Sequence, residues 1–213
     1  MAGEHDRKSN FRLRRFSTLT LLRFGVGESL ELRLESDGYV DSRTDDVTTP
    51  GPQRVRGMAD SAFGVKWHML DGEGVRPSVA WLLHADLPSG SPSLRGHGIR
   101  PSLRASLEWE LPHENSLGIM PGVIYDSADD GHRYTAGILA VTFGHNWTEQ
   151  FRTFGEVAAH QLATPGDGGN IVTYDFGVAY LITPKVQIDA AMFIGANHQT
   201  PDIAWTIGLS AKF

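Results

Sequence analysis

Apolar and polar residues alternate with a period of two along nearly the whole chain, and this pattern limits what the chain can fold into. Between residues 101 and 111, leucine, alanine or tryptophan occupies every second position, while serine, arginine and glutamate fill the positions between. The alternation recurs at residues 61–70 and 75–87. A period of two places successive side chains on opposite faces of an extended strand, whereas a helix needs a period near 3.6. The sequence therefore predicts an all-β fold.

The alternation predicts about eleven strands, most of them roughly ten residues long. A tilted strand needs about 9–11 residues to cross a bilayer, whereas strands of globular proteins usually have about 5–6 residues. The predicted strands are 16–26, 29–36, 61–70, 75–87, 101–111, 116–126, 134–146, 150–161, 171–182, 185–194 and 203–213.

The connections between these strands alternate between short and long. The short turns are 26–28, 71–74, 113–115, 146–149 and 183–185, and the long Gly-, Pro- or Ser-rich loops are 37–59, 88–100, 127–133, 162–170 and 195–202. Short turns at one end and long loops at the other are typical of outer-membrane barrels, with the short turns on the periplasmic side. Because there is no helical period and no linker, we expect one barrel domain over residues 16–213. Residues 1–15 are expected to be a polar N-terminal remnant or loop.

Composition excludes several classes of function. The formal net charge of −6 comes without a clustered basic face, so no nucleic-acid partner is expected. The absence of cysteine excludes disulfide frameworks, thiolate metal sites and a cysteine nucleophile, and it is compatible with export through an oxidising compartment. No apolar run approaches the ~18 residues of a membrane helix, so a membrane protein of this sequence must cross with strands.

The polar face of the strands indicates that it lines a lumen. It is rich in small residues and carries charges of both signs, whereas a soluble barrel would place its apolar face inward. We therefore predict an antiparallel up-and-down transmembrane β-barrel with about eleven of twelve strands present. The predicted lumen-lining charged residues are Arg23, Glu31, Arg33, Glu35, Lys66, His68, Arg76, Asp86, Arg104, Glu108, Glu110, Arg152, Glu156, Asp175 and Asp189.

The apolar face should contact outer-membrane lipid. Aromatic residues near the strand ends are expected at the lipid interface rather than in a binding cage. These residues are Trp67, Trp109, Trp147, Tyr174, Tyr180, Trp205 and Phe213. The alternating segment 203–213 closes on a terminal phenylalanine and resembles the C-terminal strand that the barrel-assembly machinery recognises in bacterial outer-membrane proteins.

Several segments also resemble one family of outer-membrane transporters, named for the meta-pathway of phenol degradation. The matching stretches are Leu21–Leu34, Gly64–Trp67, Pro77–Ala80 with Leu87–Ser91, Val186–Asp189 and Gly208–Phe213, and the resemblance runs from about residue 16 to the end. It implies an outer-membrane barrel with a link to aromatic catabolism. It implies neither a particular substrate nor particular binding residues.

Other residue patterns that could carry chemistry are better explained structurally. Asp129, Asp130, Gly131 and His132 lie in a long loop, where acidic and His residues could activate water, but the same letters are typical of a turn. His68, His84 and His160 share the polar face without a metal-ligand spacing. There is no P-loop, dinucleotide fingerprint or nucleophile elbow. We expect no catalytic residue, no metal and no cofactor.

The beginning of the chain raises a question of strand direction. If the last strand runs toward the periplasm, the strand at 16–26 does too, so the two cannot pair antiparallel. Residues 1–12 look too short and polar to supply another strand, and the first 15 residues lack the apolar core of an export signal. The sequence therefore predicts an upstream segment with an export signal and one further strand, and an open seam between 16–26 and 203–213.

The preferred function is a passive outer-membrane channel or transporter component for small solutes, including aromatic or hydrophobic ones. A non-conducting barrel, acting as a structural or surface-interaction protein, is the second interpretation. A hydrolase at the barrel rim is the third.

Overall fold

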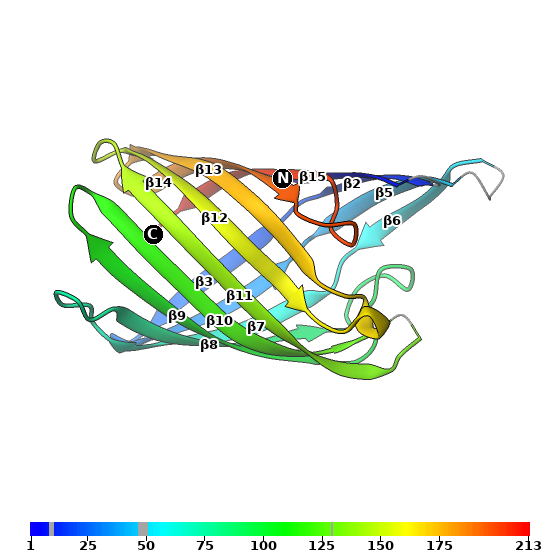
Figure 1. Ribbon diagram of the computed structural model, residues 1–213, viewed down its shortest axis with the longest axis horizontal. Coiled ribbons are helices and arrows are strands. Elements are labelled where there is room, and N and C mark those ends of the chain that lie inside the picture. Colours follow the sequence, from blue (N-terminus) through cyan, green and yellow to red (C-terminus); the bar gives the residue numbers. More distant parts are fainter. Residues whose placement is uncertain (9–10, 47–50, 129) are drawn as a thin grey trace.

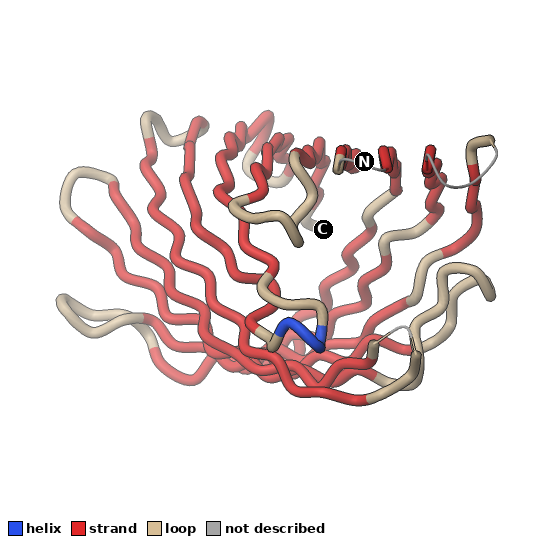
Figure 2. Tube along the Cα trace, turned by 45° about the vertical axis from the view of Figure 1, so that its right-hand side comes forward, coloured by secondary structure: helices blue, strands red, loops and turns tan. Residues whose placement is uncertain are grey.

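In the computed structural model, residues 1–8, 11–46, 51–128 and 130–213 are described. Fifteen strands in this part of the chain form one antiparallel sheet, which curls so that one face turns inward and the other outward (Figures 1 and 2). The strands are β1 (Ala2–Arg7), β2 (Phe11–Ser17), β3 (Thr20–Val26), β4 (Leu30–Ser36), β5 (Tyr39–Asp46), β6 (Gln53–Met58), β7 (Ser61–Leu70), β8 (Ser78–Leu87), β9 (Arg100–Leu111), β10 (Asn115–Ser127), β11 (Arg133–Asn146), β12 (Phe151–Leu162), β13 (Ile171–Thr183), β14 (Val186–Gly195) and β15 (Ile203–Ala211).

From β7 to β15 each strand pairs with the next along the chain. The remaining order is β15-β1-β2-β5-β6 at one end of the sheet and β3-β4-β7 at the other. Only Thr18 and Leu19 separate β2 from β3, so the chain runs directly from the group of strands at one end of the sheet to the group at the other end. The single described helix is the short 3-10 turn Pro165–Asp167.

The strand count differs from the predicted eleven because β1, β2, β5 and β6 were not foreseen as separate strands. Residues 1–15, expected to be a remnant or loop, hold β1 and most of β2, and the expected loop 37–59 holds β5 and β6. The alternation of apolar and polar residues could not reveal β5 because its outward positions hold Asp41, Arg43 and Asp45. Period two is visible in a sequence only where one face is apolar.

The prediction that residues 1–12 cannot supply a strand is also wrong. β1 lies between β15 and β2, with Gly3 opposite Trp205 on one side and Phe16 on the other. The rings of Phe16 and Trp205 meet edge to face at 6.4 Å between centroids. A side chain at position 3 would collide with the Trp205 ring, so glycine lets the two aromatic residues close over a short polar strand. β1 pairs antiparallel with β15, which is the orientation that the count of strand directions requires for a strand next to β15.

Three two-residue interruptions form a row of bends across neighbouring strands, at 18–19, 37–38 and 59–60. Backbone hydrogen bonds link the three bends, from Thr18 N to Asp37 O at 3.0 Å and from Ala59 N to Gly38 O at 2.8 Å. Gly38 has a φ of +63°, and a Cβ there would collide with the Thr18 carbonyl. The bends at 37–38 and 59–60 each shift the in–out alternation by one residue, as bulges do.

Burial on this sheet is the reverse of burial in a soluble barrel. Small and polar side chains of the inner face are buried, such as Ala136 at 1% and Ser102 at 3% exposure. Large apolar side chains of the outer face are exposed, such as Leu83 at 57% and Phe176 at 54%. An outer face of this kind is stable only against an apolar surrounding. These side chains lie on the faces that the alternation in the sequence predicts.

Candidate functional site

The inner face carries a ladder of charges of alternating sign that begins on β3 and β4. Arg23 Nη2 lies 2.6 Å from Glu31 Oε2, and Arg33 Nε lies 3.0 Å from Glu35 Oε1. Arg33 also lies 3.8 Å from Glu31. Lys66 on β7 is directly opposite Glu31 in the sheet. Because successive inward positions hold opposite charges, each group is neutralised by its neighbours along the wall.

His84 on β8 continues the ladder toward the end of the molecule that has the long loops. Its Nδ1 lies 3.9 Å from Glu35 and its Nε2 lies 3.4 Å from Asp86. Its side chain is only 10% exposed. Arg104 on β9 stands directly opposite Leu82, the inward neighbour of His84, and lies within electrostatic reach of Glu35 and Asp86.

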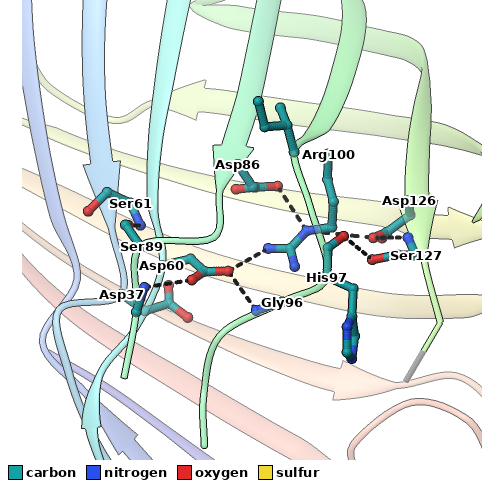
Figure 3. A network of polar contacts seen from close by, with 12 residues as sticks. Asp37, Asp60, Ser61, Asp86, Ser89, Gly96, His97, Arg100, Asp126 and Ser127 are labelled. Carbon is teal, nitrogen blue, oxygen red and sulfur yellow. Dashed lines mark hydrogen bonds and ion pairs between the residues drawn. The ribbon is translucent and has the colours of Figure 1, made fainter. Parts of the chain in front are cut away.

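The ladder ends on Arg100, which contacts three carboxylates (Figure 3). Its guanidinium lies 3.2 Å from Asp60, 3.6 Å from Asp126 and 3.9 Å from Asp86. These residues come from the β6–β7 bend, β8, β9 and β10, so one arginine joins four parts of the wall. The three acids around one guanidinium leave this end of the ladder negative.

Asp60 also holds the β8–β9 loop (residues 88–99) in place. One carboxylate oxygen accepts a hydrogen bond from Gly90 N and the other from Gly96 N, both at 2.9 Å (Figure 3). Ser91 bonds to both main-chain groups of Met58, and a Cβ on the inward-facing Gly57 would meet Ser91 and Leu94. The β8–β9 loop therefore packs against the inner face of the sheet.

The far side of the same loop is tied to β10 and β11. Ser127 Oγ and Arg133 Nη1 both donate to the carbonyl of His97, at 2.8 and 2.9 Å. Arg133 also donates to the carbonyl of Ile99. Because hydrogen bonds hold it on both sides, the β8–β9 loop lies across the inner edge of the sheet and does not extend freely from it.

A second polar group on the inner face is acidic. Glu156 on β12 stands directly opposite Asp175 on β13, and Thr142 on β11 donates a hydrogen bond to Glu156. Asp175 is fully buried, and neither of its carboxylate oxygens has a hydrogen-bond partner within the described chain. Nearby, His160 and Thr173 are 3.2 Å apart. No ion pair neutralises Glu156 or Asp175 in the described part of the chain.

The structure thus brings together five of the residues predicted to line the lumen, Arg23, Glu31, Arg33, Glu35 and Asp86. The remaining predicted residues take no part in the ladder's ion pairs. His68 contacts Asp71 and Arg76 contacts Glu73 at the β7–β8 turn, Ser106 donates to Glu108, Arg152 contacts Gln187, Asp189 lies over Gly208, and Lys66, Arg104, Glu110, Glu156 and Asp175 make no ion pair in the described chain.

Sequence reasoning missed Asp60, Arg100 and Asp126, and it left His84 out of the set. Arg100 and Asp126 continue the inward phase of β9 and β10 into segments expected to be at a loop boundary or a strand end. Extending the strand predicted at 101–111 by one residue would have found Arg100, and Asp126 is already the last residue of the strand predicted at 116–126. Asp60 carries no such signal because it lies in a bend.

Most of the aromatic residues predicted for the interface lie on the outer face. Trp67, Tyr174 and Tyr180 are 47%, 50% and 44% exposed. Trp109 donates its indole N–H to the carbonyl of Val75, and Trp205 packs on Phe16. Trp147 contacts His145 edge to face, and Phe213 is fully exposed beyond β15.

The loop residues with an enzyme-like pattern form a tie between two loops. His132 Nδ1 lies 3.1 Å from Asp130 and its Nε2 lies 2.8 Å from Asp167 beside the 3-10 turn, while Asp129 lies outside the described residues. Hydrogen bonds that Asp167 and Asp130 accept from His132 raise the pKa of His132. Hydrogen bonds from Thr164 and His132 lower the pKa of Asp167, and hydrogen bonds from His132 lower the pKa of Asp130. With both ring nitrogens engaged, His132 has no free nitrogen to accept a proton from water.

Two kinds of feature are absent from the described part of the chain. No group of three or more His, Cys, Asp or Glu side chains is arranged to hold a metal ion. No described helix is long and apolar enough to cross a membrane.

The comparisons with known proteins agree on the class of fold. The family model described as "Putative MetA-pathway of phenol degradation" matches residues 7–213. No curated protein matches the sequence. The COG4313 outer membrane channel from Pseudomonas putida F1 is similar with a TM-score of 0.71 at 11% identity, covering 100% of this chain and 92% of that one.

Two porins are similar over 100% of this chain and 98% of theirs. They are the KdgM porin in complex with disordered oligogalacturonate, with a TM-score of 0.60 at 8% identity, and the NanC porin, with a TM-score of 0.58 at 11% identity. At such low identity the likeness establishes the fold, which this chain shares with outer-membrane channels.

Proposed function

This chain belongs to the family described as "Putative MetA-pathway of phenol degradation", and from that premise we propose that it is an outer-membrane channel through which small solutes pass passively. The observation that carries the proposal is the contrast between the two faces of one sheet. The outer face is apolar and exposed, and the inner face carries a charge ladder from Arg23 to Asp126. A wall with lipid on one side and water on the other needs this arrangement.

A channel needs a closed wall, and we infer a closed wall from the number of strands that remains when each bent stretch is counted as one strand. Each interruption, at 18–19, 37–38 and 59–60, lies within a single extended stretch of chain, and adjacent stretches of these three pair with each other on both sides of their bends. Counting β2 with β3, β4 with β5 and β6 with β7 reduces fifteen strands by three to twelve. Twelve is the even number expected of a single-chain bacterial barrel. β1 pairs with β15 over residues 2–5 and with β2 over residues 2–7, and from this pairing we infer that the wall closes. Among the described strands, β3 pairs along one edge only, with β4.

The charge pattern of the interior favours small neutral or aromatic solutes. A channel for acidic sugar chains, such as the oligogalacturonate in the KdgM complex, needs an excess of basic groups along its path. Here the ladder pairs its arginines with acids, and the group around Glu156 and Asp175 is acidic. Together with the family's link to phenol degradation, this supports solutes of aromatic or hydrophobic character.

The charges predicted to line the lumen and the outer aromatic residues have their roles within this proposal. The charged residues set the polarity of the path, and Trp67, Tyr174 and Tyr180 anchor the wall at the lipid interface. β15 and Phe213 form the segment that the barrel-assembly machinery would bind.

A specific observation favours the second interpretation, a non-conducting barrel. The β8–β9 loop lies against the inner face and is tied on both sides, by Asp60 and by Arg133. In barrels of about this size the interior is already narrow. A loop fixed there narrows it further, and complete closure would leave a structural or surface-interaction protein.

Liposome swelling separates the two interpretations. Vesicles with the refolded chain, placed in an isotonic solution of a small neutral solute, should swell faster than empty vesicles, and neutral solutes should enter faster than acidic solutes of similar size. Swelling at the rate of empty vesicles, from protein shown to be folded by its heat-dependent shift in gel mobility, would leave only the non-conducting barrel.

A further inference from the structure

The outer face changes from apolar to basic on the long-loop side of the row of bends. On β2 the outward position next to Phe16 is Arg14, and on β6 the outward position next to Met58 is Arg56. We call the outward arginines of β1, β2, β5 and β6 the arginine face. They are Arg7, Arg12, Arg14, Arg43, Arg54 and Arg56.

The register of the sheet places like charges directly opposite one another in the arginine face. Arg14 on β2 is paired in register with Arg43 on β5, and Arg43 is paired with Arg54 on β6. Like charges directly opposite across a sheet repel and destabilise the pairing. Three arginines therefore lie in a row on three neighbouring strands, and of these Arg14 has no acidic partner among the described residues.

Acidic residues on the same face are too few to neutralise it. Asp41 lies 2.6 Å from Arg54 and 3.1 Å from Arg56, and Asp45 lies 3.4 Å from Arg43. Six arginines thus face two aspartates, which leaves an excess of four positive charges. Arg14 is exposed and makes no ion pair within the described residues.

The position of the arginine face fits the headgroup region of a bilayer. Phe16, Tyr39 and Met58, each about half exposed, are the last apolar outward residues before the arginines begin. The contact between Phe16 and Trp205 marks the edge of the apolar band, where interfacial aromatic residues are expected. Figure 1 shows β2, β5 and β6 reaching toward the end that carries the long loops.

We propose that the arginine face binds the phosphate groups of lipopolysaccharide, the phosphorylated glycolipid of the outer leaflet. Arginine matches phosphate because its planar guanidinium donates two parallel hydrogen bonds to two phosphate oxygens. In a row of exposed arginines beside an apolar band, the arginines can contact the phosphates of the lipid and the apolar band can contact its acyl chains. This inference rests on the proposed function, which places the long-loop end on the outer side of the membrane.

The test compares binding of the refolded full chain to phosphatidylcholine vesicles that contain lipid A, the same amount of dephosphorylated lipid A, or phosphatidylglycerol at the charge density of the lipid A vesicles. The variant Arg14→Gln/Arg43→Gln/Arg54→Gln removes the row. The matched control Lys185→Gln/Lys212→Gln removes exposed cations at the short-turn end. Heat-dependent gel mobility verifies that each variant folds.

The wild-type protein and the lysine variant should bind lipid A with equal affinity, and the triple arginine variant should bind at least about tenfold more weakly, because each basic residue near an anionic surface adds to binding. Equal binding by the triple variant, or equal binding to dephosphorylated lipid A or to phosphatidylglycerol, would overturn the assignment. None of these arms measures transport, so a chain that binds lipid A without conducting would refute the channel and leave this site standing.

Discussion

Leu107 and Ser106 are neighbours in β9 whose side chains point to opposite faces of the sheet. Leu107 is paired in register with Ile119 and Val79 on the outer face, and Ser106 is paired with Ala80 on the inner face. Leu107→Arg should therefore destabilise the folded protein in liposomes by about 2–4 kcal/mol if it lies near the bilayer midplane. Ser106→Arg should cost much less, and equal losses at both positions in a urea titration would remove the basis for assigning the faces.

Asp60 joins the β8–β9 loop to the end of the charge ladder, because it accepts hydrogen bonds from the loop and pairs with Arg100. Asp60→Asn keeps the size of the side chain but removes the charge that faces Arg100, and its amide can accept a hydrogen bond on only one of its two terminal atoms. We expect the β8–β9 loop to loosen and exchange its amide hydrogens at least several-fold faster, since charge-assisted bonds are the strong ones. Asp86→Asn, which leaves the loop's bonds intact, is the matched control. Unchanged exchange at Gly90 and Gly96 in Asp60→Asn would show that other contacts hold the loop.

At the scale of single residues, the sequence shows which face a side chain occupies better than it shows which residue that side chain contacts. The alternation told which face Arg23, Glu31 and Arg33 occupy, because an apolar neighbour on each side marks the phase. It could not show that Asp60 would meet Arg100, because that contact is between a bend and a strand forty residues further on. Contacts of this kind depend on how the strands are registered, which no local pattern specifies.

The contact between the two loops around His132 should depend on pH. The pKa of His132 is raised and those of Asp130 and Asp167 are lowered. A base with a raised pKa contributes its stabilising charge below its ordinary value and loses it as the pH rises through the raised value. The carboxylates would lose theirs only in strong acid. The tie between the loops should therefore weaken from neutral to mildly alkaline pH.

Amide exchange measures this expected weakening. Exchange of residues 163–169, corrected for the intrinsic pH dependence, should be faster at about pH 9 than at about pH 6, because a histidine changes charge near neutrality. The variant His132→Asn should show little difference between the two conditions. A pH dependence that persists in His132→Asn would assign it to other groups. Because the side chains of His132 and Asp130 are exposed, the effect should stay local.

The elements that sequence reasoning found and those it missed differ in one physical respect. β7 to β15 alternate between apolar and polar residues because one of their faces is apolar, and all of them lie within two or three residues of the predicted bounds. β5 and β6 are charged on the outward side and polar or small on the inward side, so their pattern is that of a loop. The bulges at 37–38 and 59–60 also shift the phase, which hides the continuity of β4 with β5 and of β6 with β7.

For the whole molecule, the proposed topology predicts which segments are accessible from outside the cell. The β8–β9 loop and the long loop at 162–170 lie at one end of the molecule, and the short turn at 71–74 lies at the other end. Protease added to intact cells should cleave at 162–170 but not at 71–74, because short turns face the periplasm. Cleavage at 71–74 in cells whose outer membrane is intact would invert the topology and with it the position of the arginine face.

The class of fold could be predicted from the sequence because it depends on a property repeated many times along the chain. The closing strand could not, since β1 is held by main-chain pairing and by the aromatic contact over Gly3 rather than by an apolar pattern of its own. Whether the interior conducts could not be predicted either, because the fixed position of the β8–β9 loop follows from a few tertiary contacts.

Single-channel recording in a planar bilayer tests the central claim, a water-filled path through a closed wall, most directly. The refolded full chain should insert and produce discrete, ohmic conductance steps, and Asp60→Asn, which loosens the β8–β9 loop, should produce larger or noisier steps of the same polarity. Arg76→Gln, a change at an exposed turn, should match the wild type. Folded protein that inserts without any conductance step, and gains none when Asp60 is replaced, would contradict the claim.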